Sequence, residues 1–228
     1  MDGSPQPRAR DADATRRRIL NAAKEEFARV GLGGARVDLI AERAEANKRM
    51  IYHYFGSKEA LFRAVLEEAY LAIRSAERAL DLEHLPPLAA MEQLVRFTWR
   101  YYLENPEFIR LVNSENLHGA RHIEGSVPLH DASRGLTELT GAILRRGVAE
   151  GSMRPGIDPV QLNITIAAIG YYYLTNRHTG EYLFERPFMT QAALDERIAF
   201  NVETILRLVR ADAAGQPRGT GDAATTDA

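Results

Sequence analysis

Residues 37–58, VDLIAERAEANKRMIYHYFGSK, have the pattern of two short helices joined by a tight turn. A helix of about two turns does not persist alone, because helix nucleation is costly. The apolar residues of this segment must therefore pack on a longer helix, and they are Ile40, Ala41, Ala44, Ile51 and Phe55. This requirement constrains the start of the chain to a three-helix module that leaves the polar residues of the second short helix outside.

The rest of the chain shows helical periodicity and no sustained strand alternation. A first helix is expected over residues 12–30, because Ile19, Ala23 and Phe27 recur every four residues and Gly31 follows. Asn47 occupies the cap position of the second short helix. Further helices are expected over residues 57–80, 86–104, 106–119, 127–150, 159–176 and 194–209. The sequence therefore predicts an all-α fold of about nine helices.

Four parts follow one another along the chain. Residues 1–11 are expected to form a disordered arm, and residues 12–58 hold the three-helix module. Residues 59–210 are expected to form a C-terminal helical bundle. Residues 211–228 have no apolar periodicity, which predicts a disordered tail.

Composition excludes several classes of function. The chain has no cysteine, so it holds no disulfide, thiolate zinc site or cysteine nucleophile, and this suits a reducing cytoplasm. No apolar run approaches the roughly 20 residues of a membrane-spanning helix. Residues 1–58 hold 12 Lys and Arg against 8 Asp and Glu, whereas the remainder holds 17 against 23. A basic front on an acidic body favours a polyanionic partner at one end of the molecule.

The second short helix opens with Asn47-Lys48-Arg49. Basic, amide and aromatic side chains at a helix start suit entry into the DNA major groove. Lys48 and Arg49 can donate to guanine edges or phosphates, and Met50 can touch a thymine methyl group or pack on the module. The alternative is a solvated basic helix whose aromatic side chains lie half in the core. The candidate DNA-binding residues are Arg36, Asn47, Lys48, Arg49, Met50, Tyr52, His53, Tyr54 and Lys58.

Residues 16–66 resemble the N-terminal domain of TetR-family transcriptional regulators. The matching positions are Ile19-Leu20, Ala22-Ala23, Phe27, Gly31, Ile40-Ala41, Ala44, Ile51-Tyr52, Tyr54-Phe55, Ser57-Lys58-Glu59 and Leu61. The resemblance implies an all-helical homodimer with a helix-turn-helix DNA-binding domain over residues 12–58. It also implies repression that a small-molecule effector relieves. In the body, residues 106–123 and 176–179 are similar to a subgroup that controls catabolic genes, including nicotinate-type degradation.

Two positions depart from the family pattern. Glu45 stands in the turn before the recognition helix, where family members usually have Gly. If that position needs a positive φ, Glu carries strain of about 1 kcal/mol. Ala35-Arg36 stands where members tend to cap the next helix with Thr or Ser, and a lost cap typically costs about 1 kcal/mol.

The body carries polar and aromatic residues on three of its predicted helices. Such groups, when they converge inside a helical bundle, can form a cavity for a small ligand. Arginine and asparagine there suit an anionic, aromatic or carboxylate effector, although each residue is individually as well explained by packing or solvation. The candidate pocket residues are Trp99, Tyr102, Arg110, Asn113, Asn116, Tyr173, Asn176 and Arg177.

The last two predicted helices carry apolar stripes that can form a dimer interface. Packing within one subunit explains either stripe alone, but two such stripes favour a two-fold interface in a protein that presents paired recognition helices. The candidate interface residues are Ile166, Ile169, Tyr173, Ile198, Val202, Ile205 and Val209.

Two rival functions remain at this point. Glu115, His118 and His122 have the spacing of a metal-binding helix, but a di-iron enzyme needs a second Glu-x-x-His pair, and the chain has none. The sequence therefore predicts no metal, no cofactor and no catalysis. A helical adaptor that does not bind DNA is the second rival.

Overall fold

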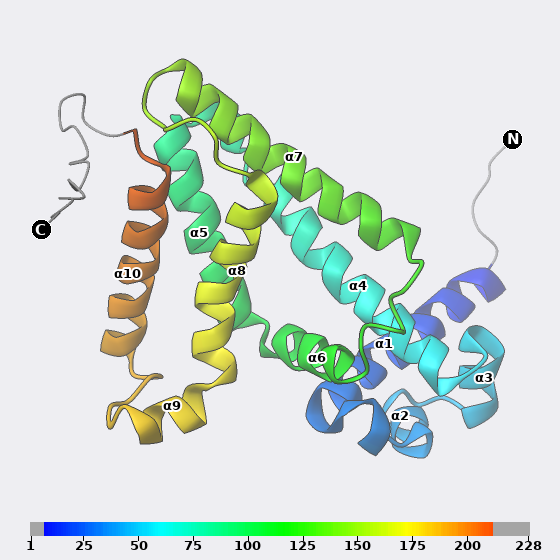
Figure 1. The fold of residues 1–228 in the computed structure, drawn as a ribbon. Helices are drawn as coiled ribbons and strands as arrows, with labels where there is room; N and C mark the ends of the chain where they lie inside the picture. Colours follow the sequence, from blue (N-terminus) through cyan, green and yellow to red (C-terminus); the bar gives the residue numbers. More distant parts are fainter. Residues whose placement is uncertain (1–6, 212–228) are drawn as a thin grey trace, which may run out of the picture.

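A computed structural model describes residues 7–211 of the chain (Figure 1). Within that range it contains ten α-helices and one 3₁₀ turn but no strand, which confirms the all-α prediction. The helices are α1 (Pro7–Gly34), α2 (Val37–Arg43), α3 (Lys48–Phe55), α4 (Lys58–Arg78), α5 (Pro87–Glu104), α6 (Pro106–Leu117), α7 (Val127–Ala149), α8 (Pro159–Thr175), α9 (Arg177–Leu183) and α10 (Gln191–Val209). No helix in the described range is long and apolar enough to cross a bilayer.

Helices α1 to α3 form the small module at one end of the molecule (Figure 1). Helix α1 is broken at Gly31, whose φ of 68° and ψ of 175° are not helical, so the break falls at the predicted end. The helix begins at Pro7, so residues 7–11 of the expected arm are helical; residues 1–6 lie outside the described range. Ile40 and Ile51 are fully buried against this helix, as the short helices require.

Helix α4 runs from the module into the body beside α7 (Figure 1). Its Phe62 ring meets the Phe27 ring of α1 edge-on at 5.0 Å, which fastens the two parts together. Helices α5, α7, α8 and α10 surround a second apolar core. Helix α6 lies across the lower end of the body and packs against α1.

Helix α9 is the element that the nine-helix prediction missed. It has only two turns, and its sequence shows no apolar periodicity. Its two large apolar side chains, Tyr182 and Leu183, are exposed. Gly180 permits the helix because the Phe188 ring lies against it, and an added Cβ would meet that ring at 2.6 Å. The predicted tail begins at Ala211, whose backbone N–H donates to Ser152, and residues 212–228 lie outside the described range.

Candidate DNA-binding surface and ligand hollow

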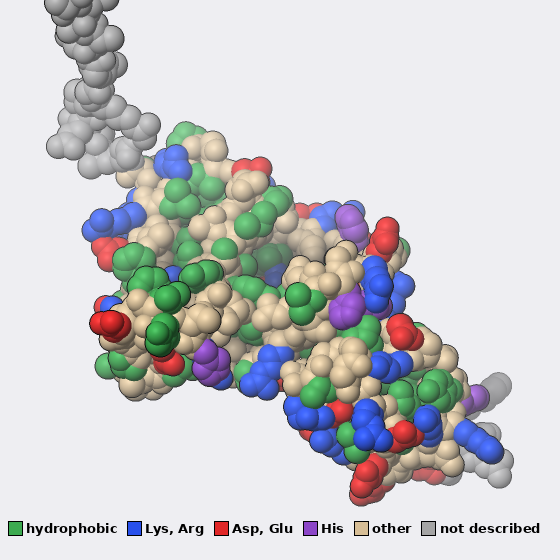
Figure 2. Space-filling view, turned by 60° about the horizontal axis from the view of Figure 1, so that its bottom comes forward, with side chains coloured by type: hydrophobic (Ala, Val, Ile, Leu, Met, Phe, Trp, Pro, Cys, Tyr) green, Lys and Arg blue, Asp and Glu red, His purple; other side chains and the backbone are tan. Residues whose placement is uncertain are grey.

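Helix α3 presents a polar face, and Ile51 is its most deeply buried side chain. The side chain of Asn47 accepts from the backbone N–H of Arg49 at 2.9 Å, so the predicted cap is formed. Ile51 is fully buried, whereas Arg49, Tyr52 and His53 are exposed. The exposed residues therefore stand on the outer side of α3, where a DNA groove can reach them. Figure 2 shows Lys and Arg side chains gathered at this end, with acidic side chains among them.

Both departures from the family pattern have a structural consequence. Glu45 adopts a φ of 49°, which is the left-handed conformation. The position therefore does need a positive φ, and Glu carries the expected strain there. Arg36 stands at the N-cap of α2 with no side-chain hydrogen bond, so that cap is absent. The Arg36 side chain is exposed and remains available to a phosphate.

Two lysines of the candidate set make contacts within the protein. The Lys48 ammonium lies 2.8 Å from the Asp38 carboxylate, and this hydrogen bond lowers the pKa of Asp38 and raises that of Lys48. The Lys58 ammonium donates to the carbonyl of Ala35 at 2.8 Å. Both lysines therefore have a partner within the protein, which the sequence did not show. A lysine has three donors, so each ammonium can share a phosphate with its present partner.

The middle of α3 is less open than its start. Met50 and Tyr54 are partly buried and pack on the module core, so packing explains Met50 and its contact with a base is not required. Sequence reasoning overlooked Arg16 of α1, whose guanidinium lies 5.2 Å from the Phe55 ring centroid. The helical pattern of α1 does not show that Arg16 borders α3, because it carries no information on contacts between helices.

A hollow of about 390 Å³ lies among α5, α6, α8 and α9. Four predicted pocket residues line it, namely Tyr102, Arg110, Asn113 and Arg177. Apolar side chains that include Ile109 and Leu174 form the rest of the wall. Burial raises the pKa of the Tyr102 hydroxyl, which therefore stays neutral. In the described part of the chain neither Arg110 nor Arg177 forms an ion pair.

The other four predicted pocket residues do not line this hollow. Asn116 donates to the carbonyl of Val112, and Asn176 to that of Tyr172, so both amides satisfy their own helices. Trp99 and Tyr173 meet edge-on at 5.7 Å on a different side of α8. The spacing of residues along one helix shows which of them share a face. It does not show which faces of different helices are in contact.

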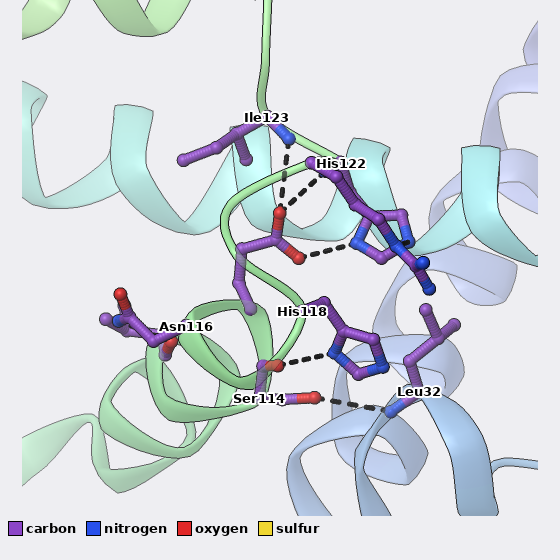
Figure 3. A network of polar contacts seen from close by, with 9 residues as sticks. Leu32, Ser114, Asn116, His118, His122 and Ile123 are labelled. Carbon is purple, nitrogen blue, oxygen red and sulfur yellow. Dashed lines mark hydrogen bonds and ion pairs between the residues drawn. The ribbon is translucent and has the colours of Figure 1, made fainter.

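Glu115 organises the loop after α6 (Figure 3). Its carboxylate accepts from the backbone N–H groups of His122 and Ile123 and lies 2.7 Å from Nδ1 of the His122 ring. His118 instead faces the carbonyl of Ser114. Glu115 and His122 are thus partners of each other, whereas His118 has a backbone partner. No group of three potential metal ligands is found among the described residues.

The stripe predicted for the dimer interface lies largely inside the subunit. Ile166, Val202, Ile205 and Val209 are buried in the second core, where α10 packs on α5, while Ile169, Ile198 and Tyr173 are partly buried. The interface prediction is corrected for the four buried residues. Different apolar side chains face outward on the same two helices, and these are Val160, Ile164, Tyr172, Phe200 and Leu208.

Two family models match the chain. The model described as "Bacterial regulatory proteins, tetR family" matches residues 19–65. The model described as "Tetracyclin repressor-like, C-terminal domain" matches residues 87–205. The matched segments cover the three-helix module and most of the body.

Curated and solved relatives agree with these matches. The transcriptional repressor NicS of Pseudomonas putida is 41% identical over 75% of this chain and 81% of its own length. The transcriptional regulator RutR of Escherichia coli is 31% identical over 89% of this chain and 92% of its own. The crystal structure of SCO4942 from Streptomyces coelicolor has a TM-score of 0.64 at 28% identity, covering 86% of this chain and 98% of that one.

Proposed function

Because this chain belongs to the TetR family of bacterial transcriptional regulators, we propose that it represses transcription by binding a two-fold symmetric operator as a homodimer. Residues 12–58 form the DNA-binding domain, and residues 59–210 form the domain for ligand binding and dimerisation. The observation that carries the proposal is the exposed start of α3, where Arg49 and Tyr52 stand clear of the core. The protein acts in the cytoplasm, where its DNA is.

The DNA contact consists of base readout at the start of α3 and phosphate contacts around it. Arg49 suits a guanine edge, because its guanidinium can donate two parallel hydrogen bonds. Tyr52, Arg36, Lys48 and Lys58 suit phosphates, which set the register of the protein on the duplex. In a two-fold dimer the half-sites lie about one DNA turn, or roughly 34 Å, apart.

The homodimer forms through the outer faces of α8 and α10. Ile164 and Phe200 are 55% and 59% exposed, and Val160, Tyr172 and Leu208 extend the same surface. A monomer would leave this apolar stripe in water, and burying it against its two-fold copy removes that cost.

The effector is a small carboxylate that enters the hollow between α5 and α8. Arg110 and Arg177 line the hollow without ion-pair partners in the described range, so they provide charge for an anion, and the apolar wall accommodates its body. The side-chain oxygen Oδ1 of Asn113 accepts a hydrogen bond from the Tyr171 hydroxyl. This bond orients the side-chain amide and leaves its NH₂ group free to donate to a ligand. A ligand that favours the conformation unable to span both half-sites lowers operator affinity by about 5- to 150-fold.

Selection of bound duplexes from a random pool, followed by anisotropy titration, tests the DNA-binding proposal. Arg49→Ala and Tyr52→Ala should each weaken the selected duplex by about tenfold or more while helicity and dimerisation are kept. Arg100→Ala, which removes an exposed arginine of α5, is the matched control and should bind like the parent. A parent protein that selects no duplex at low salt would support the adaptor reading instead.

Calorimetric titration with a panel of aromatic and aliphatic acids tests the effector proposal. Binding should weaken about tenfold or more when Arg110 and Arg177 are both replaced by Gln, because a charged hydrogen bond to the ligand is lost. An effector should also release the selected duplex at concentrations that saturate the hollow. Acids that bind but leave operator affinity unchanged would contradict the regulatory role of this hollow.

A further inference from the structure

An ion pair joins the two short helices of the helix-turn-helix on their outer surface. The ammonium of Lys48, the first residue of α3, lies 2.8 Å from the carboxylate of Asp38 in the first turn of α2. The two side chains are 49% and 60% exposed, so water reaches both. An ion pair as open as this one contributes little to the stability of a fold. Stability alone therefore does not explain a carboxylate at this place.

The Asp38 carboxylate stays charged where the operator would lie. The hydrogen bond from Lys48 lowers the pKa of Asp38, and the nearby charge of Arg36 lowers it further. A carboxylate repels the phosphates of DNA and receives no hydrogen bond from them, so it weakens contact with the backbone. It can accept a hydrogen bond from the amino group of a base in the major groove. Asp38 is therefore suited to a base and unsuited to a phosphate.

The ion pair belongs to the same surface as the exposed start of α3. Lys48 and Tyr52 are four residues apart and so share a face of this helix, and Tyr52 is 44% exposed. The Asn47 cap fixes where α3 begins, and the contact with Lys48 fixes the Asp38 carboxylate beside that helix. The carboxylate is thus held next to the proposed reading residues before DNA arrives.

We infer that Asp38 is a specificity-determining residue of the operator contact, which accepts a hydrogen bond from the N4 amino group of one cytosine in each half-site. Lys48 is its positioning residue and can still share a phosphate, because an ammonium has three donors. Thymine and guanine present acceptors in the major groove and are rejected, whereas adenine presents an amino group beside the acceptor N7 and is intermediate. The inference rests on the proposed binding of a two-fold symmetric operator.

Exchange of each base pair of the selected duplex, made in both half-sites at once, tests the role of Asp38. Affinities are measured by anisotropy at one salt concentration. The parent should prefer cytosine at one position by about fivefold or more over thymine or guanine. Asp38→Ala should abolish the preference at that position alone. Asp38→Asn should move it towards adenine, because an amide accepts from N6 and donates to N7 of that base.

The same titrations test the positioning role of Lys48. Lys48→Gln loses the charge but can still donate to Asp38, so it should weaken every duplex and keep the preference for cytosine. Lys48→Ala leaves the carboxylate without support and should also reduce that preference. A preference that survives Lys48→Ala unchanged would overturn the positioning role.

Glu42→Ala is the matched control, because Glu42 is an exposed acid of α2 one turn after Asp38. It removes the same charge and should leave every base preference unchanged. The inference alone is overturned, and the DNA-binding proposal stands, if Asp38→Ala keeps all preferences of the parent or changes the affinity of all duplexes equally. Asp38 would then serve only the dipole of α2. A parent that selects no duplex overturns the DNA-binding proposal and this inference together.

Discussion

The hydroxyl of Ser114 on α6 accepts a hydrogen bond from the backbone N–H of Leu32 at 3.3 Å, and both residues are buried. This bond joins the body to α1 one residue after the break at Gly31. An added Cβ at Gly31 would meet the same hydroxyl at 3.3 Å. The end of α1 is thus fitted closely to α6, which on its other side lines the hollow between α5 and α8 through Ile109 and Asn113.

Replacing Ser114 with Ala should destabilise the protein. The N–H of Leu32 would stay buried without an acceptor, which costs about 1–3 kcal/mol, and the length of the bond favours the lower value. Urea unfolding followed by circular dichroism measures the change. Ser133→Ala removes an exposed serine hydroxyl from α7 and should alter the free energy of unfolding by less than about 0.5 kcal/mol. Equal effects of the two substitutions would show that the Ser114 bond contributes nothing.

Much of this arrangement could be predicted from local sequence. The spacing of Ile19, Ala23 and Phe27 predicted the buried face of α1, and Asn47 predicted where α3 starts. These features succeed because the residues that cause them lie within one or two turns of each other. Pro159 likewise marked the first turn of α8, which Asp158 caps.

Contacts between distant segments were the part that sequence could not supply. Periodicity showed that Ile205 and Val202 share an apolar face, but it did not show that α5 covers that face. The charge pattern placed Lys48 on a basic helix, yet its partner Asp38 lies on the preceding helix. Helix α9 was not predicted because its packing depends on the contact between Gly180 and Phe188, which are eight residues apart and joined by a loop.

Replacing Glu45 with Gly should stabilise the helix-turn-helix. The residue has a φ of 49°, where a side chain costs about 1–2 kcal/mol. Gly removes this strain, but it also gives the unfolded chain more conformational entropy, which offsets part of the stabilisation. A net gain of about 0.5–1 kcal/mol in the free energy of unfolding is expected. Glu42→Gly, three residues earlier and inside α2, should instead lose about 1 kcal/mol. Effects of the same sign at both positions would contradict the strain at Glu45.

Glu77 should make the stability depend on pH. Burial raises its pKa to about 7, against the opposing effect of Arg74, whose guanidinium lies 2.8 Å away. Between the unfolded pKa near 4.5 and about 7, the folded state keeps a proton that the unfolded chain has lost, so stability falls as pH rises. Glu77→Gln stays neutral and should remove that slope, leaving the variant more stable than the parent by about 1–3 kcal/mol at pH 8.

The check on Glu77 is a series of urea midpoints between pH 4.5 and pH 8 for parent and variant. Glu92→Gln is the control, because Glu92 pairs with Arg96 on the surface of α5 and should leave the slope as in the parent. A parallel fall in both proteins would mean that Glu77 is ionised in the folded state across the whole range.

Two isoleucines on α8 separate folding from association. Ile166 is 5% exposed and belongs to the second core, whereas Ile164, two positions earlier, is 55% exposed on the outer face. Ile166→Ala should cost about 2–5 kcal/mol of stability, because it removes buried methyl groups and leaves a cavity.

Ile164→Ala removes the same side chain from a surface that water covers in the monomer, so the monomer should lose little stability. If α8 and α10 form the dimer, Ile164→Ala should weaken association, and Ile164→Glu should weaken it further by placing like charges in the interface. Sedimentation velocity at several concentrations measures both. A dimer that withstands Ile164→Glu would place the interface on another face of the body.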